Sequence, residues 1–207
     1  MKNKTKFGGF KMEKPGCVVL AAGMGKRFGA NKLTAALGGR SLILRALETV
    51  PTECFSSVVV VTQYPEVMKL AGEFHFAAIL NDKPELGLSR SVHLGLTALR
   101  DRPAVCFQVS DQPLLRKESV AALADFWHQQ PEQIAALAHG GVRGNPCIFP
   151  EKFFPELMAL TGDIGGAAVA RRHEDALRLL EVPAEELWDV DTPQALSEAE
   201  HTLKGEN

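Results

Sequence analysis

The sequence has no long apolar run, no strong excess of one charge and no clustered cysteines. No apolar stretch approaches the roughly 18–20 residues that cross a membrane, and none follows the N-terminal lysines as it would in a secretory signal. The net charge of −2 excludes a general attraction for nucleic acid or an anionic membrane, so anion binding must be local. The isolated cysteines exclude zinc-site spacing and favour free thiols in a reducing, cytoplasmic compartment.

Length and periodicity indicate the fold class. The 207 residues, 45% of them hydrophobic, predict a disordered tail at 1–14 and a single domain at 15–207. Short apolar runs alternate with helical patterns, so we expect a mainly parallel sheet covered on both faces. The expected strands are 18–22, 57–62, 77–80, 104–109, 133–138, 146–149, 176–182 and 188–190, with a loop at 139–145. The expected helices are 41–50 (capped by Ser41), one beginning near Pro65, 89–100, 117–129, 163–173 (capped by Asp163) and 193–203.

The first predicted strand ends in a loop rich in glycine and cations: Gly23, Gly25, Lys26, Arg27 and Lys32. Glycines allow the loop to turn tightly, and inward N–H groups with added positive charge can cradle phosphates. The spacing does not match a P-loop, and Phe28 stands where the dinucleotide fingerprint needs a small residue. The loop therefore predicts a nucleotide site of another kind.

Carboxylates follow two later segments. Asp111 comes directly after strand 104–109 and Ser110, while Asp189 and Asp191 alternate with Val190. Strand ends of a parallel sheet share one edge, so Asp111 and the glycine loop are expected to converge, with Asp111 and Asp189 as Mg²⁺ ligands and Asp191 as the alternative to Asp189. Asp111 could instead cap a turn, and Asp191 or Thr192 could cap the last helix.

A further turn-rich stretch contains Asn81, Gly87, Ser89 and Ser91. Its serine hydroxyls could bind a base or ribose. They could equally cap the helix that follows, and for Ser89 the cap is the preferred interpretation.

The loop Leu-Ala-Ala-Gly-x-Gly-x-Arg-Phe-Gly-x-x-Lys resembles the signature of the MobA-like nucleotidyltransferases, especially their molybdenum cofactor cytidylyltransferase branch. Segments 87–91, 111–113, 144–146, 162–163 and 189–193 also resemble motifs of this family. The resemblance implies a three-layer α/β/α, Rossmann-like fold and Mg²⁺-dependent transfer of a nucleoside monophosphate with release of pyrophosphate. The implied catalytic residues are Arg27 and Lys32, the metal ligands Asp111, Asp189 and Asp191, and the nucleotide-binding residues Leu20, Ala21, Ala22, Gly23, Gly25, Lys26, Asn81, Gly87, Ser89 and Ser91.

The resemblance also suggests the two substrates. Ala22 stands where the guanylyl branch commonly has glycine, which favours CTP as donor and molybdopterin as acceptor, with a molybdoenzyme as a further partner. Asn145, where relatives often have histidine, and Arg90, in a usually serine-rich loop, depart from the family pattern. The alternatives are a nucleotidyltransferase for a sugar phosphate or another phospho-alcohol, and a non-catalytic nucleotide- or cofactor-binding chaperone.

Overall fold

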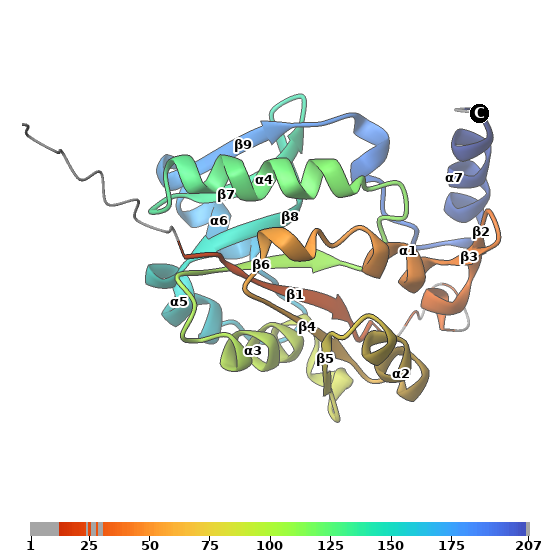
Figure 1. Ribbon diagram of the computed structural model, residues 1–207, viewed down its shortest axis with the longest axis horizontal. Helices are drawn as coiled ribbons and strands as arrows, with labels where there is room; N and C mark the ends of the chain where they lie inside the picture. The colour runs from red at the N-terminus through yellow and green to blue at the C-terminus, as the bar shows by residue number, and fades with distance from the viewer. Residues whose placement is uncertain (1–12, 24, 26–27, 29–30, 206–207) are drawn as a thin grey trace, which may run out of the picture.

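A computed structural model describes residues 13–23, 25, 28 and 31–205. Within them, seven strands form one sheet in the order β5-β4-β1-β6-β8-β7-β9 (Figure 1). All neighbours pair in parallel except β8, which runs antiparallel to β6 and β7. The predicted mainly parallel α/β fold is confirmed. The strands are β1 Gly16–Ala21, β4 Ser57–Thr62, β5 Ala77–Leu80, β6 Ala104–Val109, β7 Ile134–His139, β8 Val142–Pro150 and β9 Leu177–Glu181.

Helices cover both faces of this sheet because successive strand residues point to opposite sides. On β1, Cys17 and Val19 pack into one cluster with α1, α2 and α4, and Val18 packs into the other with α3, α5 and α6. Cys17, Cys106 and Cys147 are buried free thiols, as predicted. The helices are α1 Leu42–Glu48, α2 Pro65–Glu73, α3 Leu88–Ala98, α4 Lys117–Gln129, α5 Phe154–Met158, α6 Ala167–Arg172 and α7 Pro193–Gly205.

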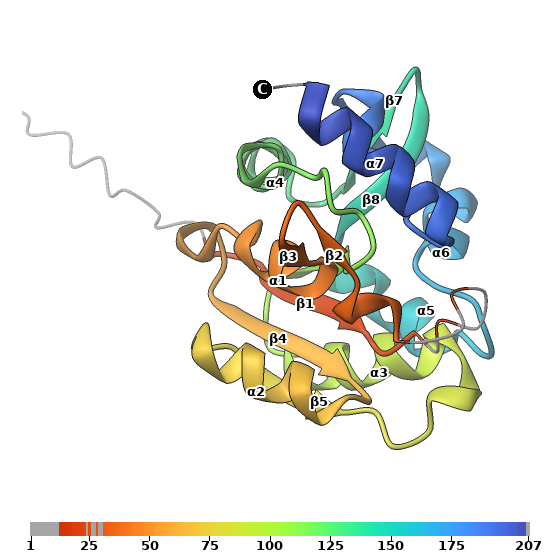
Figure 2. The same cartoon turned by 90° about the vertical axis from the view of Figure 1, so that its right-hand side faces the viewer.

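The last helix, α7, lies apart from the two main layers. It packs with the small hairpin β2 (Ala36–Leu37) and β3 (Arg40–Ser41) through a third apolar cluster that includes Leu37, Val190 and Ala199. Figures 1 and 2 show α7 and this hairpin on the side toward which β1 points. The C-terminal helix therefore stands beyond the carboxyl ends of the parallel strands.

Four local predictions are wrong. The expected loop 139–145 is mostly strand, because Gly140 and Gly141 alone make the turn, with φ of 56° and 76°, and β8 pairs with β7 from Val142 onward. Residues 188–190 are not a strand, since the backbone N–H of Val190 donates to the loop carbonyl of Asp111.

The other two errors concern helix starts. The N-cap of α3 is Gly87, and Ser89 lies buried inside the helix rather than capping it. The N-cap of α6 is Gly166, while the Asp163 carboxylate accepts a hydrogen bond from the N–H of Leu88 at 3.3 Å. Asp163 therefore ties α3 to the loop before α6.

None of the helices in the described part of the chain is long and apolar enough to cross a membrane.

Candidate active site

A cleft of about 620 Å³ opens where the parallel strands end. It brings together five segments that are distant in sequence: the glycine loop after β1 as far as Leu33, the segment from 84 to the start of α3, the end of β6, the 162–163 loop before α6, and Asp191 before α7. Nine of the residues selected from the sequence line it: Leu20, Ala22, Gly23, Gly25, Lys32, Gly87, Ser91, Asp111 and Asp191. Strand ends of a parallel sheet are where ligands of this fold class bind.

The described part of the glycine loop turns tightly at the cleft. Gly25 has a positive φ of 57°, and its carbonyl accepts a hydrogen bond from the N–H of Phe28. The Tyr64 hydroxyl donates to the carbonyl of Gly23 at 2.8 Å, so α2 supports the loop from outside. Lys26 and Arg27 lie outside the described residues, and their predicted roles stay predictions.

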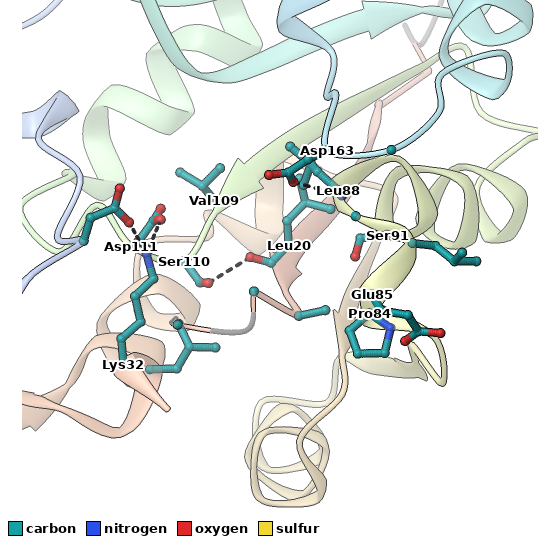
Figure 3. Close-up of a pocket in the computed structure, with 18 residues that line it drawn as sticks. Leu20, Lys32, Pro84, Glu85, Leu88, Ser91, Val109, Ser110, Asp111 and Asp163 are labelled. Carbon is teal, nitrogen blue, oxygen red and sulfur yellow. Dashed lines mark hydrogen bonds and ion pairs between the residues drawn. The ribbon is translucent and has the colours of Figure 1, made fainter. Parts of the chain in front are cut away.

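Lys32 joins two carboxylates at one end of the cleft. Its Nζ donates to Asp111 Oδ2 and to Asp191 Oδ1, each at 2.7 Å (Figure 3). Lys32 begins a short 3-10 helix capped by Asn31, whose side-chain oxygen accepts from the N–H of Leu33. Three separate segments thus place one cation and two anions around a common point.

The two carboxylates determine the charge of Lys32. Burial alone would lower the pKa of its ammonium, but Asp111 and then Asp191 outweigh burial and raise that pKa above its ordinary value of 10.5. Lys32 therefore stays charged at neutral pH. Two of the three donors of its ammonium are used by the carboxylates, so one N–H remains for a ligand in the cleft.

Hydrogen bonds tie the Asp111 loop to the segment that carries Asp189 and Asp191. Besides the Val190–Asp111 backbone bond of 2.8 Å, Gln112 Nε2 donates to Asp189 Oδ1 at 3.0 Å and to the carbonyl of Leu187 at 3.2 Å. The buried carboxylate of Glu186 accepts from the N–H of Arg116. These bonds fix the relative position of Asp111 and Asp191. The sequence placed Gln112 in the 111–113 motif but gave it no role, and no local pattern marks Glu186.

Asp189 does not line the cleft with Asp191. It lines a separate groove of about 370 Å³, the α7 groove, formed by Leu187, Trp188, Asp189, Val190, Ala195, Glu198 and Ala199. Asp189 keeps an exposed surface, yet partial burial of its carboxyl and then the charge of Asp111 raise its pKa from 3.8 to about 6. Asp191, rather than the preferred Asp189, is the carboxylate that faces the cleft with Asp111.

The opposite end of the cleft is built around Gly87. Its φ is 85°, and a Cβ there would lie 2.4 Å from the backbone of Gly162, so only glycine fits this approach. Figure 3 shows Ser91, Leu88, Asp163 and Glu85 at this end, away from Lys32 and Asp111.

The remaining sequence-selected residues support the cleft from behind. Asn81 is buried, donates to the Ser91 hydroxyl at 3.0 Å and accepts from the N–H of Lys83. Ala21 and Ser89 are buried and do not line the cleft. Two residues that line the cleft were not selected from the sequence. One is Ser110, whose hydroxyl donates to the carbonyl of Leu20 at 2.8 Å. The other is Glu85, which lies in the turn-rich stretch without a pattern that singles it out.

A glycine loop, a lysine and paired carboxylates at the carboxyl edge of a parallel sheet define a nucleotide-binding α/β protein. Within that class, the chain belongs to the MobA-like NTP transferase domain family, which matches residues 17–177. It is therefore a nucleotidyltransferase of a family that uses an NTP.

Two curated relatives share part of the sequence. The chain is 27% identical over 190 residues to the purine catabolism protein PucB of Bacillus subtilis, covering 86% of this chain and 91% of PucB. It is 29% identical over 112 residues to a probable molybdenum cofactor guanylyltransferase of Thermococcus sibiricus, covering 54% and 55% of the two chains.

Three solved structures share the fold. A homologue of Rv0371c from Mycobacterium sp. strain JC1 has a TM-score of 0.78 and 24% identity, covering 93% of this chain and 98% of that one. Rv0371c of Mycobacterium tuberculosis in complex with manganese has a TM-score of 0.72 and 18% identity, covering 91% of this chain and 99% of that one. CMP:2-keto-3-deoxy-manno-octonic acid synthetase complexed with CTP has a TM-score of 0.72 and 15% identity, covering 94% of this chain and 100% of that one.

Proposed function

We propose that this nucleotidyltransferase moves CMP from CTP onto the phosphate of molybdopterin, in a Mg²⁺-dependent reaction that releases pyrophosphate. The observation that carries the proposal is the group formed by Asp111, Lys32 and Asp191 in the same cleft as Gly23 and Gly25. Nucleotidyl transfer asks a protein mainly to position its substrates and to compensate charge. This group and the glycine loop supply both.

The carboxylates fit a magnesium ion. Asp111 Oδ1 is buried and has no hydrogen-bond partner, and Asp191 lies within reach of the same ammonium. Two carboxylates suit Mg²⁺, which one or two carboxylates commonly hold together with substrate phosphates and water. Asp111 and Asp191 would hold the ion, and Asp189 would support them through Gln112.

The chain's own groups then perform the positioning. A phosphate oxygen of the acceptor forms a bond to the α-phosphorus of CTP, the bond from that phosphorus to the β-phosphate oxygen breaks, and pyrophosphate leaves. Bound Mg²⁺ supplies positive charge to the triphosphate. The loop amides near Gly23 and Gly25, with Arg27, hold the departing phosphates, and the third N–H of Lys32 donates to the α-phosphate.

Ala22 favours CTP as the donor. It lines the cleft and stands at the position where the guanylyl branch commonly has glycine. The synthetase of the same fold was solved with CTP. The probable guanylyltransferase of Thermococcus sibiricus makes GTP the donor to test against it. That relative's name also supports a molybdenum cofactor as the acceptor.

Two other functions compete. One is a nucleotidyltransferase for a sugar phosphate or another phospho-alcohol, since the CMP:2-keto-3-deoxy-manno-octonic acid synthetase shares the fold. A cofactor-binding chaperone would not need two carboxylates bridged by a lysine, so the Asp111–Lys32–Asp191 group favours catalysis.

The test incubates the purified protein and Mg²⁺ with each of the four NTPs labelled at the α-phosphate, with molybdopterin or with a panel of sugar phosphates. We expect label from CTP on molybdopterin together with stoichiometric pyrophosphate. Label from GTP on the acceptor would mean that GTP rather than CTP is the donor. Label on a sugar phosphate would mean that a sugar phosphate rather than molybdopterin is the acceptor. Nucleotide binding without any turnover would support the chaperone.

A further inference from the structure

The α7 groove contains an aromatic side chain that the fold leaves uncovered. Trp188 is 45% exposed, whereas the other tryptophan of the chain, Trp127, is 2% exposed in the core. The backbone around Trp188 is fixed on both sides, by Gln112 at the carbonyl of Leu187 and by Asp111 at the N–H of Val190. An exposed indole on such a fixed backbone, beside a cavity, offers a flat surface for stacking.

Two carboxylates line this groove from its two sides. Glu198 stands on α7 beside the small side chain of Ala195, and Asp189 stands on the segment that carries Trp188. Asp189 Oδ1 accepts from Gln112, and Glu198 Oε1 accepts from Gln194 at 2.9 Å. The described residues that line the groove include no lysine, arginine or histidine. The groove therefore disfavours a phosphate and favours an uncharged ring with N–H donors.

The position of the groove links it to the reaction. One segment separates the two cavities, because Asp191 lines the cleft while Asp189 and Val190 line the groove. An acceptor lying along this segment would have its phosphate beside Lys32 and Asp111 and its remaining part against Asp189.

We propose that the α7 groove is the acceptor subsite, which binds a planar heterocycle with an amino-pyrimidinone edge by stacking on Trp188 and by hydrogen bonds to Asp189 and Glu198. The inference rests on the proposed function, since it assigns the ring of a pterin acceptor to a place in the structure. A sugar phosphate has no such ring and gains nothing from the indole.

The test measures binding of 6-hydroxymethylpterin by the anisotropy of its own fluorescence, with Mg²⁺ present and no nucleotide. Lumazine, which lacks the 2-amino group, serves as the matched ligand. The variants are Trp188→Ala, Trp188→Phe and Glu198→Gln, with Glu200→Gln as the control, because Glu200 lies on the same helix but does not line the groove and pairs with Lys204.

We expect Trp188→Ala to raise the dissociation constant for the pterin about tenfold or more, as lost aromatic stacking would. Trp188→Phe should raise it less, Glu198→Gln several-fold and Glu200→Gln not at all, and lumazine should bind more weakly than the pterin. The affinity for CTP should not change in any variant, and circular dichroism establishes that each variant is folded.

If both the folded Trp188→Ala protein and the folded Glu198→Gln protein bind the pterin with unchanged affinity, the proposed acceptor subsite is wrong. If the same proteins still transfer label from CTP to molybdopterin, the proposed function survives that result. If the pterin binds in the groove as described but no label reaches molybdopterin, the subsite survives and the proposed function fails.

Discussion

Lys32 shows how much depends on single residues in this cleft. Its ammonium lies 2.7 Å from both Asp111 and Asp191, so it balances two acids that would otherwise repel each other. The sequence marked Lys32 and Asp111, because each follows a loop or strand end with a recognisable pattern. It could not decide between Asp189 and Asp191. In a strand, their alternation with Val190 would point both side chains the same way, but the segment is not a strand and is held by bonds to the Asp111 loop.

Asp111→Asn should reduce Mg²⁺-dependent turnover by at least about 100-fold, because it removes a charge at the metal and at Lys32 while keeping the shape of the side chain. Steady-state pyrophosphate release measures the loss. Asp101→Asn, at an exposed aspartate of a surface turn, is the control and should be as active as the wild type. Near-normal turnover in Asp111→Asn removes this residue from the mechanism.

Asp189 should make the metal-free protein less stable as the pH rises. Its folded pKa of about 6 lies above the ordinary 3.8, so between these pH values the folded state binds more protons than the unfolded state and the free energy of unfolding falls. Asp189→Asn cannot ionise, so its stability relative to the wild type should grow from pH 4 to pH 7. Urea unfolding in a chelating buffer measures this, and a difference that is flat with pH contradicts the effect. Solvent at the exposed carboxyl limits its size.

At the scale of elements, α3 is placed by its close approach to β1. A Cβ on Gly95 would lie 2.5 Å from Cγ1 of Val18, a stiff β-branched side chain that is fully buried. This contact sets the height of α3 above the sheet, and thereby the position of Gly87 and Ser91 at the cleft.

Gly95→Ala should therefore destabilise the protein by about 1–3 kcal/mol through overpacking. Gly72→Ala is the matched control, since Gly72 lies in α2 with open space around its Cβ position; it should be neutral or stabilising by up to about 1 kcal/mol. Urea denaturation measures both. Equal effects of the two substitutions would mean that the Gly95–Val18 contact does not set the packing.

Elements with strong local signals were predicted with their bounds. The strands 57–62, 77–80 and 104–109 and the helix 117–129 coincide with β4, β5, β6 and α4, because buried β-branched runs and a long amphipathic pattern determine them locally. β8 was shortened in the prediction, since its first residues owe their strand geometry to pairing with β7. The short helix α5 was missed altogether. The start of β8 and the helix α5 both depend on tertiary contacts, which no local sequence pattern predicts.

At the scale of the whole molecule, the cleft and the α7 groove are assembled from distant parts of the chain. The sequence predicted that the loops after β1 and β6 would meet, because parallel strand ends share an edge. The groove was not predicted. It exists only where α7 packs against the segment around Val190 through a third apolar cluster, and no periodicity gives that docking.

Binding of Mg²⁺ and CTP across these segments should stabilise the entire fold. At ligand concentrations of about 100 times the dissociation constant, the free energy of unfolding should rise by about 2.7 kcal/mol, which for a chain of this size raises Tm by roughly 5–10 °C. Differential scanning fluorimetry measures the shift. CTP with a chelator, and Asp111→Asn with Mg²⁺ and CTP, should show much smaller shifts; a full shift in either would place the nucleotide elsewhere.

The bond between Val190 and Asp111 also has a consequence for protein synthesis. When a growing chain has emerged from the ribosome up to the end of β8, it already contains the glycine loop, Lys32 and Asp111, together with the central strands that carry them. It still lacks Asp191 and the backbone N–H that secures the Asp111 loop. On the proposed function, we therefore expect the nascent polypeptide to assemble nucleotide-binding parts early and to become competent for transfer only after the segment around Val190 has emerged and docked.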